Sequence, residues 1–323
     1  MIEILEGGIQ TTVQDYPGRR GLLAKGFFPA GPMDHLAFRA ANLLVGNTAD
    51  AAALEVTFGN FGMRLEADAL VAVCGAVAPV ALDGEDVALW ESVFARPGAE
   101  LRIGASSGPG FRLYVGVSGG IDVPPLFGSR ATYTMGTLGG FEGRALAAGD
   151  RLPLGANGGD TPARFDESVR PRYAREWEVR AMRGPQAAPD FLTEAGMETL
   201  FSRPWSVNAN SNRTGIRLEP CVFEWARASG GIAGGHPSNI LDNGYPVGAI
   251  NINGDLPVIL GPDGPTAGGF VVAATVIHAD LWKLGQLRPV GDHVRLCEVE
   301  IEEAVALDRD LDESMTPMSL EEV

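Results

Sequence analysis

A run of polar side chains between residues 230 and 270 holds the residues of this sequence best suited to chemistry. Glycine, proline, asparagine and aspartate crowd around two short apolar segments there, and loops of this composition bring backbone close to a ligand. The polar side chains are His236, Ser238, Asn239, Asp242, Asn243, Asn251, Asn253, Asp255 and Asp263. Neutral amides and hydroxyls on a rigid scaffold suit a small uncharged polar substrate. The alternative is that these residues only cap turns.

Other catalytic patterns find little support. Residues 116–120 (GVSGG) match the GxSxG motif of serine hydrolases, but that motif needs a following helix, and the adjacent Pro124 and Pro125 disfavour one. The sequence has neither a GxxxxGK[ST] phosphate loop nor a GxGxxG after a strand. Its four histidines are scattered without metal-ligand spacing. We therefore expect this chain to bind neither a nucleotide nor a metal.

The elements that must position these residues follow a β pattern. Turns are frequent, with 43 glycines and 22 prolines, and the segments between them are short and rich in valine, isoleucine and leucine. We predict strands at Leu70–Cys74, Phe111–Val117, Trp177–Ala181, Ala249–Ile252 and Pro257–Leu260. We predict helices at Met33–Val45 and His278–Gln286. The predicted fold is mainly β, with two barrel-like domains and a few short helices.

The chain also divides along its length. Three similar turn-and-strand phrases, RPGAELRIG, AAGDRLPLG and RPVGDHVRL, are compatible with two related halves. A polar stretch without apolar periodicity separates them. We predict one β domain at 1–155, a linker at 156–175, a second β domain at 176–308 and an acidic tail at 309–323.

Composition excludes several partners. A balance of 25 basic against 41 acidic residues gives a net charge of −16, which repels nucleic acids and anionic membranes. The N-terminus does not resemble a secretory signal, and no apolar run reaches membrane-spanning length. The three cysteines are far apart and odd in number, which favours neither disulfides nor zinc. A cytoplasmic location is expected.

Longer phrases of the sequence resemble a known family. The stretches GIQTTVQDYPGRRG, GPMDHLAFRAANLLVGN, AALEVTFG and YVGVSGGIDVPPLFGSRATY are similar to allophanate hydrolase subunit 2, the AB region of biotin-dependent carboxyltransferases. The resemblance extends from about residue 2 to residue 305. Within this family, 5-oxoprolinase components and KipA-like regulators of a histidine kinase usually carry GAIQVPPDGQPI followed by QTTGGYP. This chain instead reads HPSNILDNGYPVGAININGDLPVILGPDGPTAGGF, which is more similar to urea carboxylase. Those two other functions stay open as alternatives.

The resemblance implies a fold, a reaction and partners. It implies cyclophilin-like barrel domains that become active when the AB half meets a CD half. The enzyme component would be a ligase-type carboxyltransferase, moving CO2 from carboxybiotin to urea or a related small amide to give allophanate. Lys25 and Lys283, the two lysines of the chain, do not lie in a biotin-attachment hairpin. Biotin, a biotin carboxylase, a biotin carrier and the CD half would therefore come on other chains, and this chain alone should be inactive.

The resemblance also implies roles for single residues. Its predicted catalytic residues are His236, Asn239, Asp242 and Asp263. Its predicted substrate ligands are Ser238, Asn239, Asn243 and Asn251. Its predicted cofactor ligands are Gly264, Gly268 and Gly269, through backbone N–H groups. A neutral amide at position 239 can donate to a urea carbonyl and accept from its N–H groups, whereas guanidine would call for a carboxylate.

Overall fold

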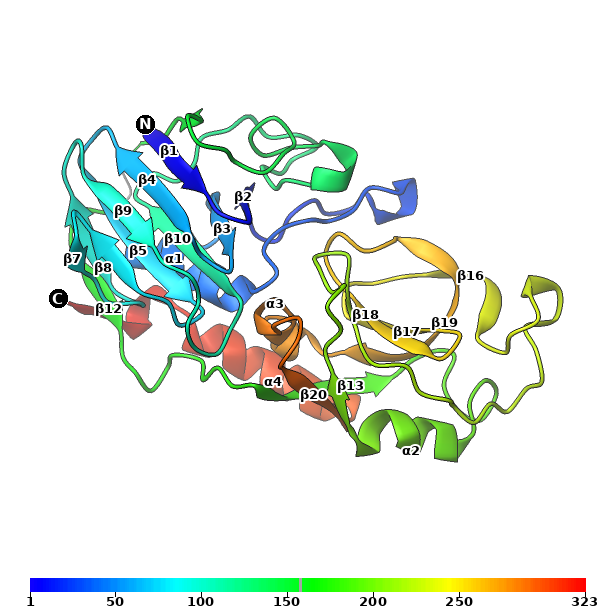
Figure 1. Cartoon of the computed structure of the whole chain (residues 1–323). Helices are drawn as coiled ribbons and strands as arrows, with labels where there is room; N and C mark the ends of the chain where they lie inside the picture. Colours follow the sequence, from blue (N-terminus) through cyan, green and yellow to red (C-terminus); the bar gives the residue numbers. More distant parts are fainter. Residues whose placement is uncertain (157–158) are drawn as a thin grey trace. The chain divides into compact units, whose positions relative to one another are not determined.

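The computed structural model describes residues 1–156 and 159–323. Residues 157 and 158, which belong to the linker predicted at 156–175, lie outside the described residues. The chain forms two compact units (Figure 1). Unit 1 comprises Met1–Arg20, Pro29–Tyr173 and Asp312–Val323, and unit 2 comprises Gly21–Phe28 and Ala174–Leu311.

The mainly β prediction is confirmed, since strands hold 35% and helices 16% of the residues. The sheets are open rather than closed into complete barrels. Each of the five predicted strands forms, with ends within two residues of the prediction. Local apolar runs bounded by turn residues were therefore enough to locate them.

Unit 1 contains two large antiparallel sheets that share one hydrophobic core, and a small sheet of β12 and β21. The strands are β1 (Ile2–Gly7), β2 (Gln10–Gln14), β3 (Ala53–Thr57), β4 (Phe61–Leu65), β5 (Ala69–Gly75), β6 (Val80–Leu82), β7 (Glu85–Asp86), β8 (Ser92–Ala95), β9 (Glu100–Ile103), β10 (Arg112–Val117), β11 (Arg151–Leu152), β12 (Ala163–Phe165) and β21 (Leu320–Glu322). One sheet has the order β11-β1-β4-β9-β6-β7 and the other β2-β3-β10-β5-β8. Ile4 and Met63 of the first sheet share a buried cluster with Val56 and Val115 of the second. This face-to-face burial of apolar side chains stabilises the unit.

Helix α1 (His35–Leu44) packs against β10 and β5 of unit 1 (Figure 1). Asp34 is its N-cap, because the Asp34 carboxylate accepts from the N–H groups of Leu36 at 3.0 Å and Ala37 at 2.9 Å. The helix predicted at Met33–Val45 therefore begins two residues later than expected. It is buried on nearly all sides.

Unit 2 is one mixed sheet with helices. Its strands are β13 (Glu176–Arg183), β14 (Pro204–Ser206), β15 (Gly215–Arg217), β16 (Asn239–Gly244), β17 (Ala249–Asn253), β18 (Leu256–Leu260), β19 (Ala267–Val276) and β20 (His293–Glu298). The order is β14-β20-β13-β19-β17-β18-β15, with β16 also paired to β19. The β13 and β20 pair is parallel and the other pairs are antiparallel. Figure 1 shows β17, β18 and β19 side by side in yellow and orange.

The remaining helices are α2 (Glu194–Ser202), α3 (Lys283–Gln286) and α4 (Ile301–Ser314). The helix predicted at His278–Gln286 is divided into a 3-10 turn at His278–Asp280 and α3. Residues 309–323, predicted as an acidic tail, supply the end of α4 and β21, and β21 pairs with β12. Apolar positions hold α4 in place, since Ala304 belongs to a buried cluster and the partly buried Leu307 and Leu311 pack against it.

Candidate functional site

The segment His236–Asn239 forms a tight turn that leads into β16. The backbone N–H of Asn239 donates to the carbonyl of His236 at 3.0 Å. Ser238 is fully buried, and its carbonyl accepts from the N–H of Val271 on β19 at 3.0 Å. Its hydroxyl oxygen accepts from the N–H of Gly254 at 3.0 Å. The turn is thus fastened to β19 and to the turn that joins β17 and β18.

The same contacts set the tautomer of the His236 ring. The backbone N–H of Ser238 can only donate, and it points at Nδ1 of His236 at 3.1 Å. The Ser238 hydroxyl lies 2.8 Å from the same nitrogen. Nδ1 is therefore an acceptor, and the proton of the neutral ring lies on Nε2. Nε2 makes no hydrogen bond with the described residues, so it presents an uncommitted N–H donor.

Asn239 is held tightly while its side-chain amide stays open. A Cβ at Gly234 would lie 2.3 Å from Nδ2 of Asn239, and one at Gly230 would lie 2.6 Å from its carbonyl. Only glycine fits such close approach. Within residues 1–156 and 159–323, however, the amide group of Asn239 makes no hydrogen bond. It can therefore both donate to and accept from a ligand.

Arg227 and Trp225 contact this turn, although the sequence did not single them out. Arg227 Nε donates to the carbonyl of Pro237 at 2.8 Å, and Nη2 donates to that carbonyl and to the one of Asn239, the latter at 2.7 Å. The Trp225 ring stands perpendicular to the ring of His236, with centroids 5.7 Å apart. No side-chain pattern could have identified Arg227, because its partners are backbone carbonyls 10 and 12 residues away.

A second cluster of polar side chains, Tyr245 and Asn251, lies where β16 and β17 border β19. Asn239 is paired in register with Phe270. The Tyr245 hydroxyl donates to the carbonyl of Phe270 at 3.0 Å and accepts from its N–H at 2.7 Å. Asn251 Nδ2 lies 3.5 Å from the same carbonyl, while its Oδ1 is buried and has no partner among the described residues. Burial raises the pKa of Tyr245, so its hydroxyl stays protonated.

Asn243 and Asp242 differ in their surroundings. Asn243 Nδ2 donates to Oε1 of Gln186 at 3.3 Å, and that oxygen also accepts from the N–H of Val272 at 2.9 Å. Gln186, another residue that the sequence did not indicate, therefore ties Asn243 to β19. Asp242 is exposed and forms no ion pair in the described part of the chain.

Asp263 and Gly264 lie in a separate, closed arrangement. Both carboxylate oxygens of Asp263 accept from Arg213, Oδ2 from Nε at 2.8 Å and Oδ1 from Nη2 at 2.9 Å, and both side chains are buried. The N–H of Gly264 donates to the carbonyl of Gly261 at 2.9 Å. Gly268, by contrast, lies against the Tyr245 ring, since a Cβ added at this glycine would lie 2.7 Å from a ring carbon.

The structure thus brings most predicted site residues together and leaves two apart. The residues along β16, β17 and β19 are His236, Ser238, Asn239, Asp242, Asn243, Asn251, Gly268 and Gly269. Asp263 and Gly264 belong to the loop that Arg213 holds. Apart from the Asp242 carboxylate, the groups along β16, β17 and β19 are neutral, which suits hydrogen bonding to an uncharged amide.

Other kinds of functional site find no support in the described residues. No group of three or more His, Cys, Asp or Glu side chains that could hold a metal occurs in the described residues. None of the helices described is long and apolar enough to span a membrane. In unit 1, Ser118 of the GVSGG stretch is buried, and its hydroxyl oxygen accepts from the N–H of Leu70, so it is not exposed as a nucleophile.

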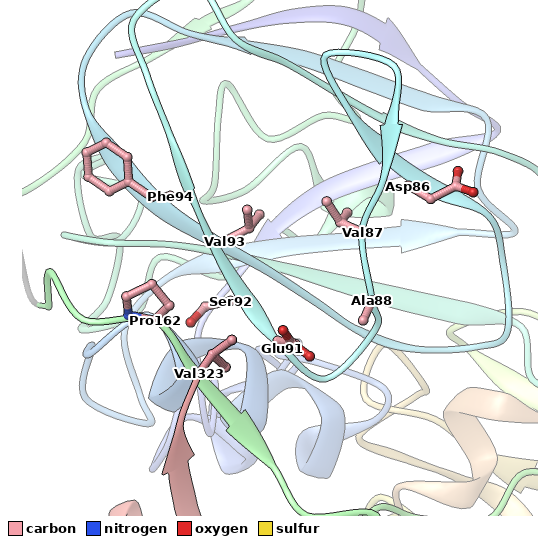
Figure 2. Close-up of a pocket in the computed structure, with 9 residues that line it drawn as sticks. All are labelled: Asp86, Val87, Ala88, Glu91, Ser92, Val93, Phe94, Pro162 and Val323. Carbon is pink, nitrogen blue, oxygen red and sulfur yellow. The ribbon is translucent and has the colours of Figure 1, made fainter.

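Unit 1 also carries a hollow of about 440 Å³ beside the edge strand β8 (Figure 2). Figure 2 shows its lining of Asp86, Val87, Ala88, Glu91, Ser92, Val93, Phe94, Pro162 and Val323. None of the predicted site residues contributes to it.

Comparison with known proteins places the chain in a family. The model for the carboxyltransferase domain, subdomain A and B, matches residues 25–298. The chain belongs to this carboxyltransferase family. The resemblance noted in the sequence is thereby confirmed.

Members of the carboxyltransferase A and B family similar to this chain include proteins of very different length. Urea amidolyase of Saccharomyces cerevisiae is 41% identical over 313 residues, which cover 95% of this chain and 17% of the yeast protein. The crystal structure of Kluyveromyces lactis urea carboxylase matches with a TM-score of 0.93 at 38% identity, over 100% of this chain and 30% of that one. A 5-oxoprolinase subunit of Escherichia coli is 34% identical over 318 residues, 96% of this chain and 95% of that protein. This chain therefore spans about a sixth of the yeast relative but nearly all of the bacterial one.

Proposed function

We propose that this chain is the AB half of a split, biotin-dependent urea carboxylase. It would help to transfer a carboxyl group from carboxybiotin, carried on another chain, to urea or a related small amide, giving allophanate. The observation that carries the proposal is that one short turn presents the amide of Asn239 and Nε2–H of His236, neither of which forms a hydrogen bond with the described residues. Both groups are neutral and fixed in place, and neither is used by the fold.

Urea needs this kind of site. Its carbonyl accepts hydrogen bonds and its two NH2 groups donate them, so neutral amides can satisfy it without burying a charge. We assign the amide of Asn239 to the urea NH2 and carbonyl groups, and Nε2–H of His236 to an oxygen that gains negative charge during transfer. Ser238 acts through His236 by keeping the acceptor nitrogen turned inward. Asp242 and Asn243 border the same strand.

The side chains along β17 and β19 also fit a bound biotin. A ureido ring offers two N–H donors and one carbonyl, and the buried Oδ1 of Asn251 is an acceptor that the fold leaves unsatisfied. We propose that Asn251, predicted above as a substrate ligand, and the backbone of Gly268 and Gly269 would hold this ring. Gly264, also predicted as a cofactor ligand, is left out because its N–H already donates to the carbonyl of Gly261. When bound as carboxybiotin, the cofactor would supply the carboxyl group. The residues of this chain would then orient the acceptor and exclude water.

The partners in this proposal are the CD half, a biotin carboxylase and a biotin carrier, assembled in the cytoplasm. One comparison is compatible with a separate subunit. A protein named as a subunit in E. coli matches this chain over 95% of its length, whereas urea amidolyase of S. cerevisiae matches over only 17%.

Reconstitution tests the proposal. The full chain is combined with CD-half, biotin carboxylase and biotin carrier proteins, and urea-dependent ATP hydrolysis is measured with and without biotinylation of the carrier. We expect turnover that needs all four proteins and biotin, and none from this chain alone. Asn239→Asp should shift kcat/KM from urea towards guanidine by at least about tenfold, because a carboxylate pairs with a guanidinium.

A matched control is Asn210→Asp, which makes the same change at an exposed turn residue of unit 2 whose side chain forms no hydrogen bond with the described residues. It should leave the ratio of the two substrates unchanged. An equal ratio in the Asn239→Asp enzyme and the wild type would refute the assignment of Asn239.

A second function rests on the bacterial relative. The whole-length match to the 5-oxoprolinase subunit of E. coli favours a component of an ATP-using lactam hydrolase that needs no biotin. The two proposals differ in the added substrate and in the need for the carrier. ATP hydrolysis that depends on 5-oxoproline and not on biotin would support this second function.

A further inference from the structure

Arg227 carries a charge that has no acidic partner among the described residues. It forms no ion pair in the described part of the chain, and its hydrogen bonds all go to backbone carbonyls. Its guanidinium lies over the Phe191 ring, 4.4 Å from the ring centroid, a contact that favours a cation. By comparison, Arg180 and Arg183 are paired with Asp280 and with Glu194 and Glu298.

The electrostatic consequences differ in sign. The carboxylate of Asp280 raises the pKa of Arg180, and that of Glu298 raises the pKa of Arg183. Burial lowers the pKa of Arg227, with no carboxylate to oppose it. The guanidinium is still charged at neutral pH. It therefore adds a positive charge directly beneath the turn that bears Asn239.

The planar guanidinium of Arg227 holds the backbone that carries the Asn239 amide. Nε and Nη2 converge on the carbonyl of Pro237, and Nη2 also reaches the carbonyl of Asn239. These carbonyls belong to the 237–238 and 239–240 peptides, so one planar group fixes the peptide planes before Ser238 and after Asn239. A lysine cannot do this, because an ammonium is a single point on a flexible stem. Nη1 makes no hydrogen bond with the described residues and stays available.

We infer that Arg227 is the positioning residue of the acceptor site, aiming the Asn239 amide through two backbone carbonyls and biasing the site towards ligands that carry a carboxylate. The inference rests on the proposed function. The proposed reaction begins with an uncharged acceptor and ends with a carboxylated product. The Arg227 cation, which has no ion pair among the described residues, therefore favours the negative charge that forms on the product. Arg227 acts on the ligand by positioning the turn and through its electrostatic field, and it does not touch the reacting atoms.

The first experiment uses the full chain alone. The side-chain amide resonances of Asn239 are recorded by NMR in the wild type, Arg227→Lys and Arg227→Met. The control is Arg217→Lys, since Arg217 Nη1 also donates to a backbone carbonyl, that of Asn210, at 2.8 Å. We expect the Asn239 amide signals to shift or broaden in both Arg227 variants and to stay unchanged in the control. Unchanged signals in Arg227→Lys would overturn the positioning role.

The second experiment uses the reconstituted complex. Corrected for the folded fraction, Arg227→Lys should raise the KM for urea by about tenfold with a smaller fall in kcat, and Arg227→Met should lower kcat/KM by at least about tenfold more. Equal losses in both variants would refute the contribution of charge. Wild-type kcat and KM in both variants after this correction would mean that Arg227 acts only on folding. If the wild-type complex shows no urea-dependent turnover, the proposed function fails, and the NMR result still decides the positioning role.

Discussion

Two polar regions of unit 2 look alike in sequence and differ in structure. Around Asp263, every charged oxygen is used, since Arg213 donates to both carboxylate oxygens inside the protein. Around Asn239, donors and acceptors are left over, on the Asn239 amide, on Nε2 of His236 and on Oδ1 of Asn251. A polar group that the fold satisfies contributes to stability, whereas one that the fold leaves open is available to a ligand.

The two regions should also respond differently when a side chain is removed. A closed ion pair loses stability when one partner is removed, because the other charge stays buried. An open amide contributes little to folding, so its loss should appear in binding instead. The comparison can therefore be tested by measuring unfolding and activity for matched variants. Four of the five tryptophans, Trp177, Trp205, Trp225 and Trp282, lie in unit 2, so tryptophan fluorescence reports mainly on that unit.

The largest expected effect is at the closed pair. Asp263→Ala leaves the Arg213 guanidinium buried without its main partner and should lower the free energy of unfolding by about 3–5 kcal/mol. Guanidinium chloride unfolding followed by tryptophan fluorescence measures the change. Asp255→Ala is the control, because its carboxylate forms no hydrogen bond or ion pair with the described residues, and it should change stability by less than about 0.5 kcal/mol. A loss below about 1 kcal/mol in Asp263→Ala would show that this region is not closed.

A smaller effect is expected at Asp280, a second closed carboxylate in the same unit. Burial would raise the pKa of Asp280, but hydrogen bonds from Arg180 and the charge of Lys283 outweigh it, and the pKa is lowered. The folded state therefore binds fewer protons than the unfolded state below the ordinary Asp value of about 3.9, and stability must rise with pH there. The contribution is complete above that value and is lost as the pH falls through the lower folded pKa.

Thermal unfolding of the wild type and Asp280→Asn between about pH 3 and pH 6 measures this contribution. The variant should lose about 2 kcal/mol at neutral pH, less than Asp263→Ala because Arg180 is partly exposed. The gap between the two proteins should narrow as the pH falls. A constant gap over the whole range would contradict the assigned direction of the pKa shift.

The sequence predicted the scaffold better than the contacts of the site. The strands β5, β10, β13, β17 and β18 follow from local apolar runs, and composition indicated the loop-rich region 230–270 that contains the turn at 236–239. The contrast between Asp263 and Asn239 does not follow, because Arg213 is 50 residues from its partner. Arg227 was missed for a related reason, since it binds carbonyls that every residue possesses. Composition identifies polar groups, but only the fold decides which of them are already satisfied.

The smallest expected effect has the opposite sign. Asn251 is 4% exposed, and its Oδ1 has no partner among the described residues. Asn251→Leu keeps the approximate volume and removes an unsatisfied acceptor, at the cost of a long contact from Nδ2 to the carbonyl of Phe270. The free energy of unfolding should stay the same or rise by up to about 1 kcal/mol, while carboxyl transfer falls.

The matched control for this change is Asn47→Leu in unit 1. There the same amide is fully used, because Nδ2 donates to the carbonyl of Val117 at 2.9 Å and Oδ1 accepts from the N–H of Gly119 at 2.8 Å. That variant should lose about 2 kcal/mol. A comparable loss in Asn251→Leu would mean that Asn251 supports the fold and is not held open for a ligand. Opposite signs for one substitution at the buried Asn251 and the half-buried Asn47 would instead establish that stability and function are assigned to different polar groups in this chain.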